Sequence, residues 1–281
     1  MPELPEVETT LRGIQPFIQH QLITKLTIRQ RQLRWPIADD FENNATGQCI
    51  LRLERRGKYL IFRLDQGAFL IHLGMSGRLR ILQQYTQPEK HDHVDVELGH
   101  QVVLRYTDPR RFGAILWVAG DISEHPLLAK LGPEPLSSAL TGHYLWQRAS
   151  TRSLPIKSLI MENKTVVGVG NIYATEALFQ ANIHPATPAH WLSLEQMDRL
   201  VEEIKTILDD AIMQGGTTLK DFLGSDGKPG YFSLKLRAYG RNKLPCVRCT
   251  TPLQSMQIGQ RTTTYCVSCQ AYPEQNNFLR T

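Results

Sequence analysis

The chain has 281 residues, which is long enough for two domains of ordinary size, each with a core of its own. The sequence contains no run of about 18 apolar residues and no secretory leader pattern, so it argues against a membrane span and predicts a cytoplasmic protein. The net charge is +5, but seven Lys and Arg against the single acid Glu274 lie from Lys235 onward. This asymmetry favours a polyanion as the partner of that segment, with a solvated basic tail as the alternative.

The first residues are Met1-Pro2-Glu3, and removal of Met1 would leave Pro2 as a free secondary amine. An α-amino group has an unperturbed pKa of about 8, so part of it is neutral at physiological pH and can attack an electrophilic sugar carbon. The carboxylate of Glu3 is placed by covalent adjacency to transfer protons. A Met-Pro start by itself is most simply an ordinary chain end, and the nucleophile interpretation depends on the residues that follow.

The region from about residue 24 to residue 118 has the pattern of β-strands separated by turns. The segments 58–64 and 68–73 flank a short turn and predict a hairpin, and further strands are predicted at 77–82, 93–98 and 101–106. The first half is therefore predicted to be an antiparallel β domain preceded by one helix. Residues 131–136 fit neither strand nor helix periodicity and predict a linker.

Helical periodicity follows this linker. Ser193 and Gln196 have the spacing of a capping box, and apolar residues at helical spacing run from there to Gly215-Gly216. Upstream, a Gly-x-Gly sequence precedes Asn171, which is predicted to cap a helix over 172–181. Amide N–H groups at the start of such a helix can bind a phosphate, although the same residues also form ordinary turns.

Four of the five cysteines form the pattern Cys246-x2-Cys249-x16-Cys266-x2-Cys269. Two C-x2-C knuckles bring four thiolates together and predict one closed, tetrahedral structural zinc site with no open position for catalysis. Two disulfides are the alternative, which a cytoplasmic setting disfavours. Cys49 stands apart from this pattern and is predicted to be a buried core residue.

Seven strings along the chain resemble the formamidopyrimidine-DNA glycosylase family, and they occur in that family's order. They are PELPEVET (2–9), RGKYL (56–60), HLGMSG (72–77), KHDHV (90–94), DPRRFG (108–113), GVGNIY (168–173) and GKPGY (227–231). Together with the four cysteines, they extend the resemblance over nearly the whole chain.

The resemblance implies an α+β fold with an N-terminal helix and an antiparallel β-sandwich over 1–131. A linker over 132–150, a helix-two-turn-helix domain over 151–234, a β-hairpin zinc finger over 235–270 and a tail over 271–281 would follow. The second of these domains would contain a lesion-recognition loop that begins at residues 216–221. Duplex DNA would lie across the cleft between the domains.

The implied activity is that of a monomeric, bifunctional DNA glycosylase and abasic-site lyase of base excision repair. Its substrates would be oxidised purines in double-stranded DNA, chiefly 8-oxoguanine opposite cytosine and formamidopyrimidines, as well as abasic sites. Pro2 would form a Schiff base with C1′ of the damaged nucleotide, followed by β- and δ-elimination. Glu3 would shuttle protons, Glu6 would support the N-terminal turn, and Lys58 would have a phosphate or elimination role.

The resemblance also implies which residues contact the DNA. Arg261, at the tip of the finger, would reach the phosphates that flank the lesion. The further phosphate contacts would be His91, Arg152, Asn171 and Tyr239, and such contacts position a duplex without reading its sequence. Three more residues would occupy the space left by the flipped nucleotide: Met75 as filler, Phe112 as wedge and Arg110 as hydrogen-bond donor to the unpaired cytosine.

Two other functions compete with this one. The sister group of enzymes that excise oxidised pyrimidines shares the proline mechanism but lacks this N-terminal string and the set of Met75, Arg110 and Phe112. A non-enzymatic zinc-ribbon protein would explain the four cysteines and the basic final segment. It would leave Pro2, Glu3 and Lys58 without a role.

Overall fold

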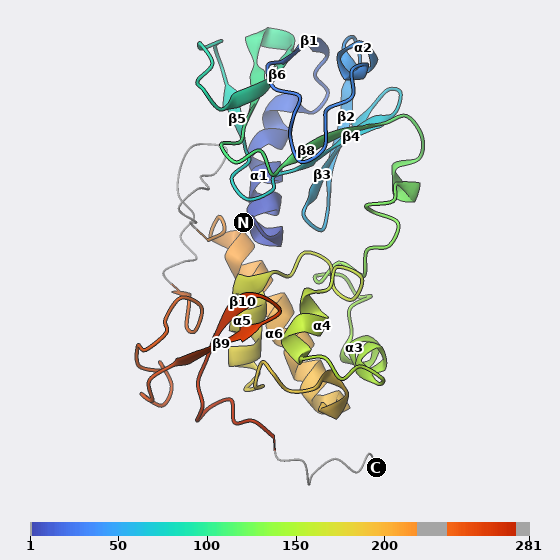
Figure 1. Ribbon diagram of the computed structural model, residues 1–281. Helices are drawn as coiled ribbons and strands as arrows, with labels where there is room; N and C mark the ends of the chain where they lie inside the picture. Colours follow the sequence, from blue (N-terminus) through green and yellow to red (C-terminus); the bar gives the residue numbers. More distant parts are fainter. Residues whose placement is uncertain (1, 218–234, 274–281) are drawn as a thin grey trace. The chain divides into compact units, whose positions relative to one another are not determined.

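The computed structural model describes residues 2–217 and 235–273, which form two compact units (Figure 1). The first unit contains residues 2–130 and 212–217, and the second contains residues 131–211 and 235–273. Most of the predicted lesion-recognition loop, the string at 227–231 and the tail from residue 274 lie outside the described residues.

Two four-stranded antiparallel sheets make up most of the first unit. One has the order β2-β3-β4-β8, with β2 at Ile50–Arg56, β3 at Tyr59–Leu64, β4 at Ala68–His72 and β8 at Ala114–Val118. The other has the order β1-β6-β7-β5, with β1 at Ile23–Ile28, β6 at Asp92–Leu98, β7 at Val103–Thr107 and β5 at Arg78–Leu82. Side chains from both sheets share one apolar core, as in a β-sandwich.

The helix α1, Leu4–Ile18, opens this unit. Glu3 is its N-cap and forms a capping box with Glu6, while Pro5 lies in the first turn, where a missing amide N–H leaves no hydrogen bond unmade. The helix contacts β2 and β3 of one sheet and β5 of the other. Its buried apolar face consists of Leu4, Val7, Leu11, Ile14 and Ile18.

The predicted strands are confirmed. The predicted hairpin is the β3–β4 pair, and a short 3-10 turn at Gly99–Gln101 joins β6 to β7. A five-residue helix, α2 at Phe41–Ala45, was not predicted, because only its first and last residues are buried and no period can show over that length. Cys49 is half-buried and not a core residue, since it precedes the edge strand β2 and pairs only with Leu22 in an isolated bridge.

The second unit is mainly helical and carries a two-stranded hairpin (Figure 1). Its helices are α3 at Gly142–Ala149, α4 at Ile156–Met161, α5 at Asn171–Gln180 and α6 at Leu194–Met213, the last of which ends in the first unit. The hairpin pairs β9, Gln254–Ile258, with β10, Arg261–Tyr265. The capping box predicted at Ser193 and Gln196 is confirmed by reciprocal hydrogen bonds of 2.9 and 3.2 Å.

Two predictions about the second unit are corrected by the structure. The stretch predicted as a linker over 132–150 contains α3, because Thr141 caps this helix through the amide of Tyr144 and the helix buries Leu145. Asn171 is the first residue of α5 and not its cap, which is Gly170. The side chain of Asn171 does not cap because it bonds to more distant partners.

Across 2–217 and 235–273, no helix has the length and apolar character that a membrane span requires.

Candidate active site and metal centre

The N-terminal turn is held by a buried carboxylate. Pro2 and Glu3 are both buried, and the amide of Glu3 donates to Oε2 of Glu6 at 2.8 Å. The other oxygen of Glu6, Oε1, accepts a 2.8 Å hydrogen bond from the amide of Thr217. Glu6 is fully buried, so these charge-assisted bonds compensate for the removal of its charge from water. The carboxylate therefore fixes the position of the turn that carries Pro2.

Gly216 leaves the space that this contact requires. It adopts φ of 81°, in the left-handed region that glycine tolerates best. A Cβ atom placed there would lie 3.0 Å from Oε1 of Glu6. A larger residue would strain the backbone and displace the carboxylate, which explains the Gly215-Gly216 pair at the end of α6.

Lys58 lies in the turn between β2 and β3, and its charge affects the pKa of His72, the last residue of β4. Tyr59 pairs with His72 across β3 and β4, with ring centroids 5.0 Å apart. The Nδ1 atom of His72 accepts from the amide of Gly74 at 3.1 Å. Burial is the largest cause that lowers the pKa of His72, and together with the charges of Lys58 and Arg34 it lowers this pKa to about 4. His72 is therefore neutral at physiological pH, and nothing in the sequence beyond its place in the string HLGMSG indicated this.

Two loops bring together the three residues predicted to fill the space left by a flipped nucleotide. The loop with Met75 and the loop with Arg110 and Phe112 are joined through Ser76, whose Oγ accepts from the amide of Arg110 at 3.2 Å. The guanidinium of Arg110 lies 4.9 Å from the ring centroid of Phe112, which is 47% exposed. A Cβ atom at Gly74 would lie within 2.6 Å of the backbone at Phe112, so the loops touch closely.

Asp108 holds these loops, and the sequence analysis did not identify it. Its carboxylate is fully buried and accepts from Ser76 Oγ at 2.6 Å, from the amide of Gly113 at 2.8 Å and from the hydroxyl of Tyr106 at 3.1 Å. Its amide donates to the carbonyl of His91 at 3.1 Å, so the predicted phosphate contact His91 adjoins the same cluster. The only sequence signal was an acid within an otherwise basic string.

In the second unit, a buried lysine joins α4, α5 and the hairpin. Lys157 is 1% exposed, and its Nζ donates to Oδ1 of Asn171 at 2.6 Å and to Oγ1 of Thr263 at 2.7 Å. The Nδ2 atom of Asn171 donates to the carbonyl of Thr262 at 3.2 Å. These bonds fix the start of α5 beside β10, whose first residue is the exposed Arg261. Sequence reasoning had not assigned a role to Lys157.

The other two predicted phosphate contacts of this unit lie in different surroundings. Arg152 precedes α4 and forms a partly exposed ion pair with Glu162, at 2.6 Å between Nη2 and Oε1. Tyr239 is half-buried, and its amide donates to Oε1 of Glu176 at 2.7 Å. The structure thus brings Asn171 to the hairpin through direct bonds, whereas Arg152 is held by an acid outside that cluster.

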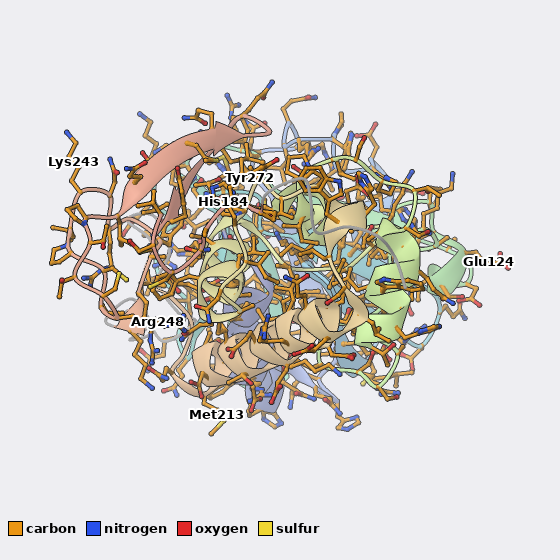
Figure 2. All side chains as sticks on the ribbon, turned by 90° about the horizontal axis from the view of Figure 1, so that it is seen from below. Glu124, His184, Met213, Lys243, Arg248 and Tyr272 are labelled. Atoms are coloured by element: carbon orange, nitrogen blue, oxygen red, sulfur yellow. The ribbon has the colours of Figure 1, made fainter. Side chains whose placement is uncertain are left out.

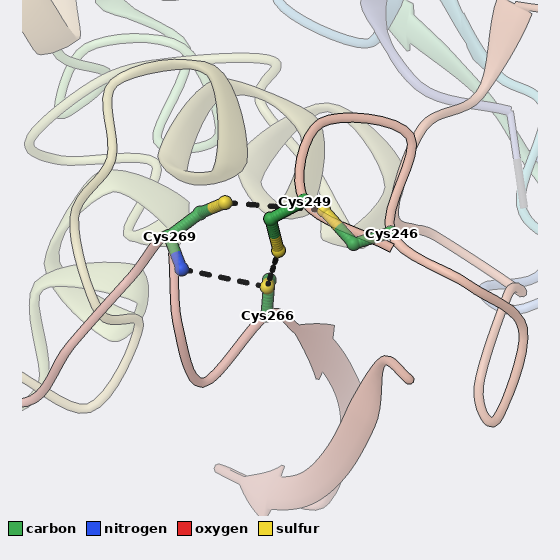
Figure 3. A group of neighbouring side chains, drawn as sticks. All are labelled: Cys246, Cys249, Cys266 and Cys269. Atoms are coloured by element: carbon green, nitrogen blue, oxygen red, sulfur yellow. Dashed lines mark hydrogen bonds between the residues drawn. The ribbon is translucent and has the colours of Figure 1, made fainter. Parts of the chain in front are cut away.

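The four cysteines of the predicted pattern converge on one site (Figure 3). Their Sγ atoms all lie within 4.8 Å of one another, at 3.9 Å for Cys246 and Cys269 and 3.4 Å for Cys249 and Cys266. These separations exceed the roughly 2.05 Å of a disulfide bond. They are close to the spacing of about 3.8 Å between sulfurs that surround a tetrahedral ion at about 2.3 Å. The site is therefore a four-thiolate metal site, and the hairpin β9–β10 lies between its two halves.

Two family models match the chain. The formamidopyrimidine-DNA glycosylase N-terminal domain matches residues 1–115, and the formamidopyrimidine-DNA glycosylase H2TH domain matches residues 131–222. A formamidopyrimidine-DNA glycosylase of Hydrogenovibrio crunogenus is 52% identical over 270 residues, covering 96% of each chain. That of Teredinibacter turnerae is 53% identical over 271 residues, covering 96% of this chain and all of the relative.

Solved structures agree with these matches. The MutM (Fpg) protein of Thermus thermophilus superposes with a TM-score of 0.86 at 37% identity and covers 97% of this chain and 100% of its own. The Lactococcus lactis Fpg in complex with DNA that contains an abasic site gives a TM-score of 0.89 at 31% identity, with 96% and 100% coverage. A complex of a Lactococcus lactis Fpg mutant with DNA that contains Fapy-dG gives the same values.

Proposed function

We propose that this chain, which belongs to the formamidopyrimidine-DNA glycosylase family, excises oxidised purines from duplex DNA and cleaves the resulting abasic strand. The observation that carries the proposal is the N-terminal turn, in which Pro2 precedes the helix cap Glu3. The buried carboxylate of Glu6 holds this turn by accepting hydrogen bonds from the amides of Glu3 and Thr217. Solved relatives bound to DNA with Fapy-dG, an abasic site or 8-oxoguanine support the choice of substrates.

The chemistry starts from Pro2 after removal of Met1. The amine nitrogen bonds to C1′, and the bond from C1′ to the damaged base breaks, with a proton delivered to the departing base. The proline nitrogen then loses its proton, and the bond from C1′ to the ring oxygen O4′ breaks with a proton taken up by O4′. The iminium that results acidifies the protons on C2′. Removal of one expels the 3′ phosphate, and a second elimination expels the 5′ phosphate. Glu3 is the proton carrier beside the amine, and Lys58 acts on a phosphate or in elimination.

The loops held by Asp108 serve recognition in this proposal. A flipped nucleotide leaves an unpaired partner and a gap in the stack. Met75 fills the gap, Phe112 wedges the neighbouring base step, and Arg110 donates to the acceptor edge of cytosine. The contact of Arg110 with the ring of Phe112 and the bond of its amide to Ser76 support this division, because they hold the arginine on the loop that also presents the wedge.

The second unit supplies the backbone contacts. Asn171, Tyr239 and Arg261 bind phosphates around the lesion, with Arg152 as a further contact, and His91 adds one from the first unit. The four thiolates hold one zinc ion, because a soft, tetrahedral four-sulfur site favours zinc in a protein that does not use it for redox chemistry. The ion would stabilise the hairpin that presents Arg261. The protein is proposed to act as a monomer in the cytoplasm, at the nucleoid, where such a DNA substrate lies.

The substrate class is tested by single-turnover excision on duplexes that carry 8-oxoguanine or 5-hydroxycytosine. We expect 8-oxoguanine opposite cytosine to be removed faster than the oxidised pyrimidine. Faster excision of the pyrimidine would instead support the function of the sister group. The family model of the glycosylase N-terminal domain matches residues 1–115, which do not include the four cysteines. This match disfavours a zinc-ribbon protein that only binds DNA, because such a protein would not need that domain.

A further inference from the structure

A buried carboxylate of the second unit joins α5 to the segment that enters the metal site. Glu176 is 3% exposed and accepts hydrogen bonds from three consecutive amides. Its Oε2 accepts from Arg237 at 2.9 Å, and its Oε1 accepts from Ala238 at 2.9 Å and from Tyr239 at 2.7 Å. A carboxylate that is removed from water needs such donors, and three donors in a row fix the backbone against the helix.

The anchored segment is packed as well as hydrogen bonded. Ala238 is fully buried in an apolar cluster with Phe179 of α5 and with Cys246 and Cys266 of the metal site. The amide of Tyr239 is engaged by Glu176, so the polar group of this residue that can donate to a phosphate is the phenol hydroxyl. The direction of that hydroxyl depends on the backbone that Glu176 holds.

The same helix carries a second phosphate contact at its start. Asn171 and Glu176 are five residues apart on α5, which separates them by about 7.5 Å along the helix axis. A rigid helix therefore sets the distance between Asn171 and the anchored Tyr239. Neither residue can move alone while the three amides remain bound.

We infer that Glu176 is a positioning residue for DNA binding, which holds Tyr239 at a fixed distance from Asn171 so that both reach phosphates of one DNA backbone. This inference rests on the proposed function. Glu176 is not a catalytic residue in this account, because it is buried against protein backbone and acts on DNA only through Tyr239.

A separate set of bonds ties the metal site to α5 when Glu176 is altered. Arg248, which is labelled in Figure 2, lies between Cys246 and Cys249 in the sequence. Its guanidinium is 4.7 Å from the ring centroid of Phe179. It also donates to the carbonyls of Phe179 at 3.1 Å and Gln180 at 3.2 Å, the last carbonyls of the helix. A change at Glu176 should therefore leave the knuckle docked and the metal bound.

The test is Glu176→Gln, which keeps the size of the side chain but replaces one acceptor oxygen with a donor. The matched control is Glu202→Gln, an exposed position on α6 that loses the same charge. Affinity is measured on a duplex with a tetrahydrofuran abasic-site analogue. Metal content is measured as well, together with the single-turnover rate of 8-oxoguanine excision at saturating enzyme. Because bonds to charged groups are the stronger kind, we expect Glu176→Gln to raise Kd about tenfold or more. The saturated rate and metal content should stay within twofold of the control.

A double-variant cycle separates positioning from general weakening. Tyr239→Phe removes the hydroxyl that Glu176 is inferred to aim, so Glu176→Gln combined with Tyr239→Phe should bind no more than twofold weaker than Glu176→Gln alone. Additive losses, or a Kd for Glu176→Gln equal to that of the control, would overturn the inference. Excision by the unaltered enzyme tests the proposed function separately, because these variants leave the N-terminal turn intact.

Amide hydrogen exchange gives a measurement that needs no variant. In the unaltered protein, the amides of residues 237–239 should exchange at least about 100-fold more slowly than in an unstructured peptide, because each is bonded to a buried carboxylate. Exchange at unprotected rates would contradict the anchoring on which the inference depends, even if Glu176→Gln failed to fold.

Discussion

Glu6 accepts a hydrogen bond from the amide of Thr217, a residue 211 positions further along the chain. The bond joins the first turn of α1 to the segment that follows α6, within one compact unit. Both oxygens of Glu6 are engaged, one by Thr217 and one by the amide of Glu3. The position of Pro2 therefore depends on a residue that is distant in the sequence.

Replacement of Glu6 by Gln should lower both stability and excision. The amide side chain offers one acceptor where the carboxylate offers two, so one buried N–H loses its partner, at a cost of about 1–3 kcal/mol in the free energy of unfolding. Urea unfolding measures this loss, with Glu124→Gln, an exposed position, as the control. Single-turnover excision of 8-oxoguanine should fall about tenfold, because the turn that carries Pro2 is less well fixed. Unchanged excision in a destabilised variant would show that Glu6 contributes to the stability of the fold but not to excision.

The metal site is predicted to be required for DNA binding but not for the folding of the first unit. Cys246→Ser removes one of four thiolates, so metal content and DNA affinity should fall together, since structural metal binding is coupled to local folding. Metal analysis and a binding isotherm measure the two effects. Amide hydrogen exchange across the strands of the first unit reports on its integrity. Full DNA affinity without metal would contradict this account of the hairpin.

Arg110→Ala is predicted to reduce selectivity for the base opposite the lesion. A bidentate contact to a base is typically worth about 1–3 kcal/mol, so the preference for cytosine over adenine opposite 8-oxoguanine should fall about tenfold or more. Cleavage of a preformed abasic site should change less. Met75→Ala is the control, because Met75 is proposed to fill space and its thioether side chain has no hydrogen-bond donor. An unchanged cytosine preference in Arg110→Ala would remove this arginine from base recognition.

The low pKa of His72 predicts a dependence of stability on pH. The pKa is about 4 in the folded protein against 6.5 for an unperturbed histidine, so the unfolded chain takes up this proton first as the pH falls. Its contribution to the free energy of unfolding is fully present above about pH 6.5 and is lost progressively towards pH 4. By pH 5 the loss amounts to about 2 kcal/mol. Urea unfolding at pH 7.5 and pH 5 should therefore show a smaller pH effect for His72→Gln than for the unaltered protein, and equal effects would refute the assignment.

The sequence predicted the elements whose signals are local. Alternating apolar residues marked the strands, and the spacing of Ser193 and Gln196 marked the start of α6. The four cysteines could also be predicted to form a metal site, because two C-x2-C knuckles supply all four of its ligands. The role of Asn171 as a cap was wrong because Lys157 and Thr262, distant in sequence, compete for its side chain.

Residues that act through distant partners gave no such signal. Asp108, Lys157 and Glu176 are single buried charges whose partners lie 32, 106 and 63 positions away for the bonds to Ser76, Thr263 and Tyr239. A buried charge cannot be told from a solvated one in the sequence alone, because its burial is a property of the tertiary structure. The start of the tail is a similar case. Tyr272 packs edge-on against His184 at 5.0 Å between ring centroids, and no pattern predicted that contact (Figure 2).

The most direct test of the account is reductive trapping with sodium borohydride on a duplex that carries 8-oxoguanine opposite cytosine. Reduction converts an iminium into a stable covalent bond, so peptide mapping of the adduct identifies the nucleophile. The account predicts an adduct on Pro2 of the chain from which Met1 has been removed, and none on Pro2 of a chain that retains Met1. An adduct on a lysine such as Lys58, or an active enzyme that gives no adduct, would contradict it.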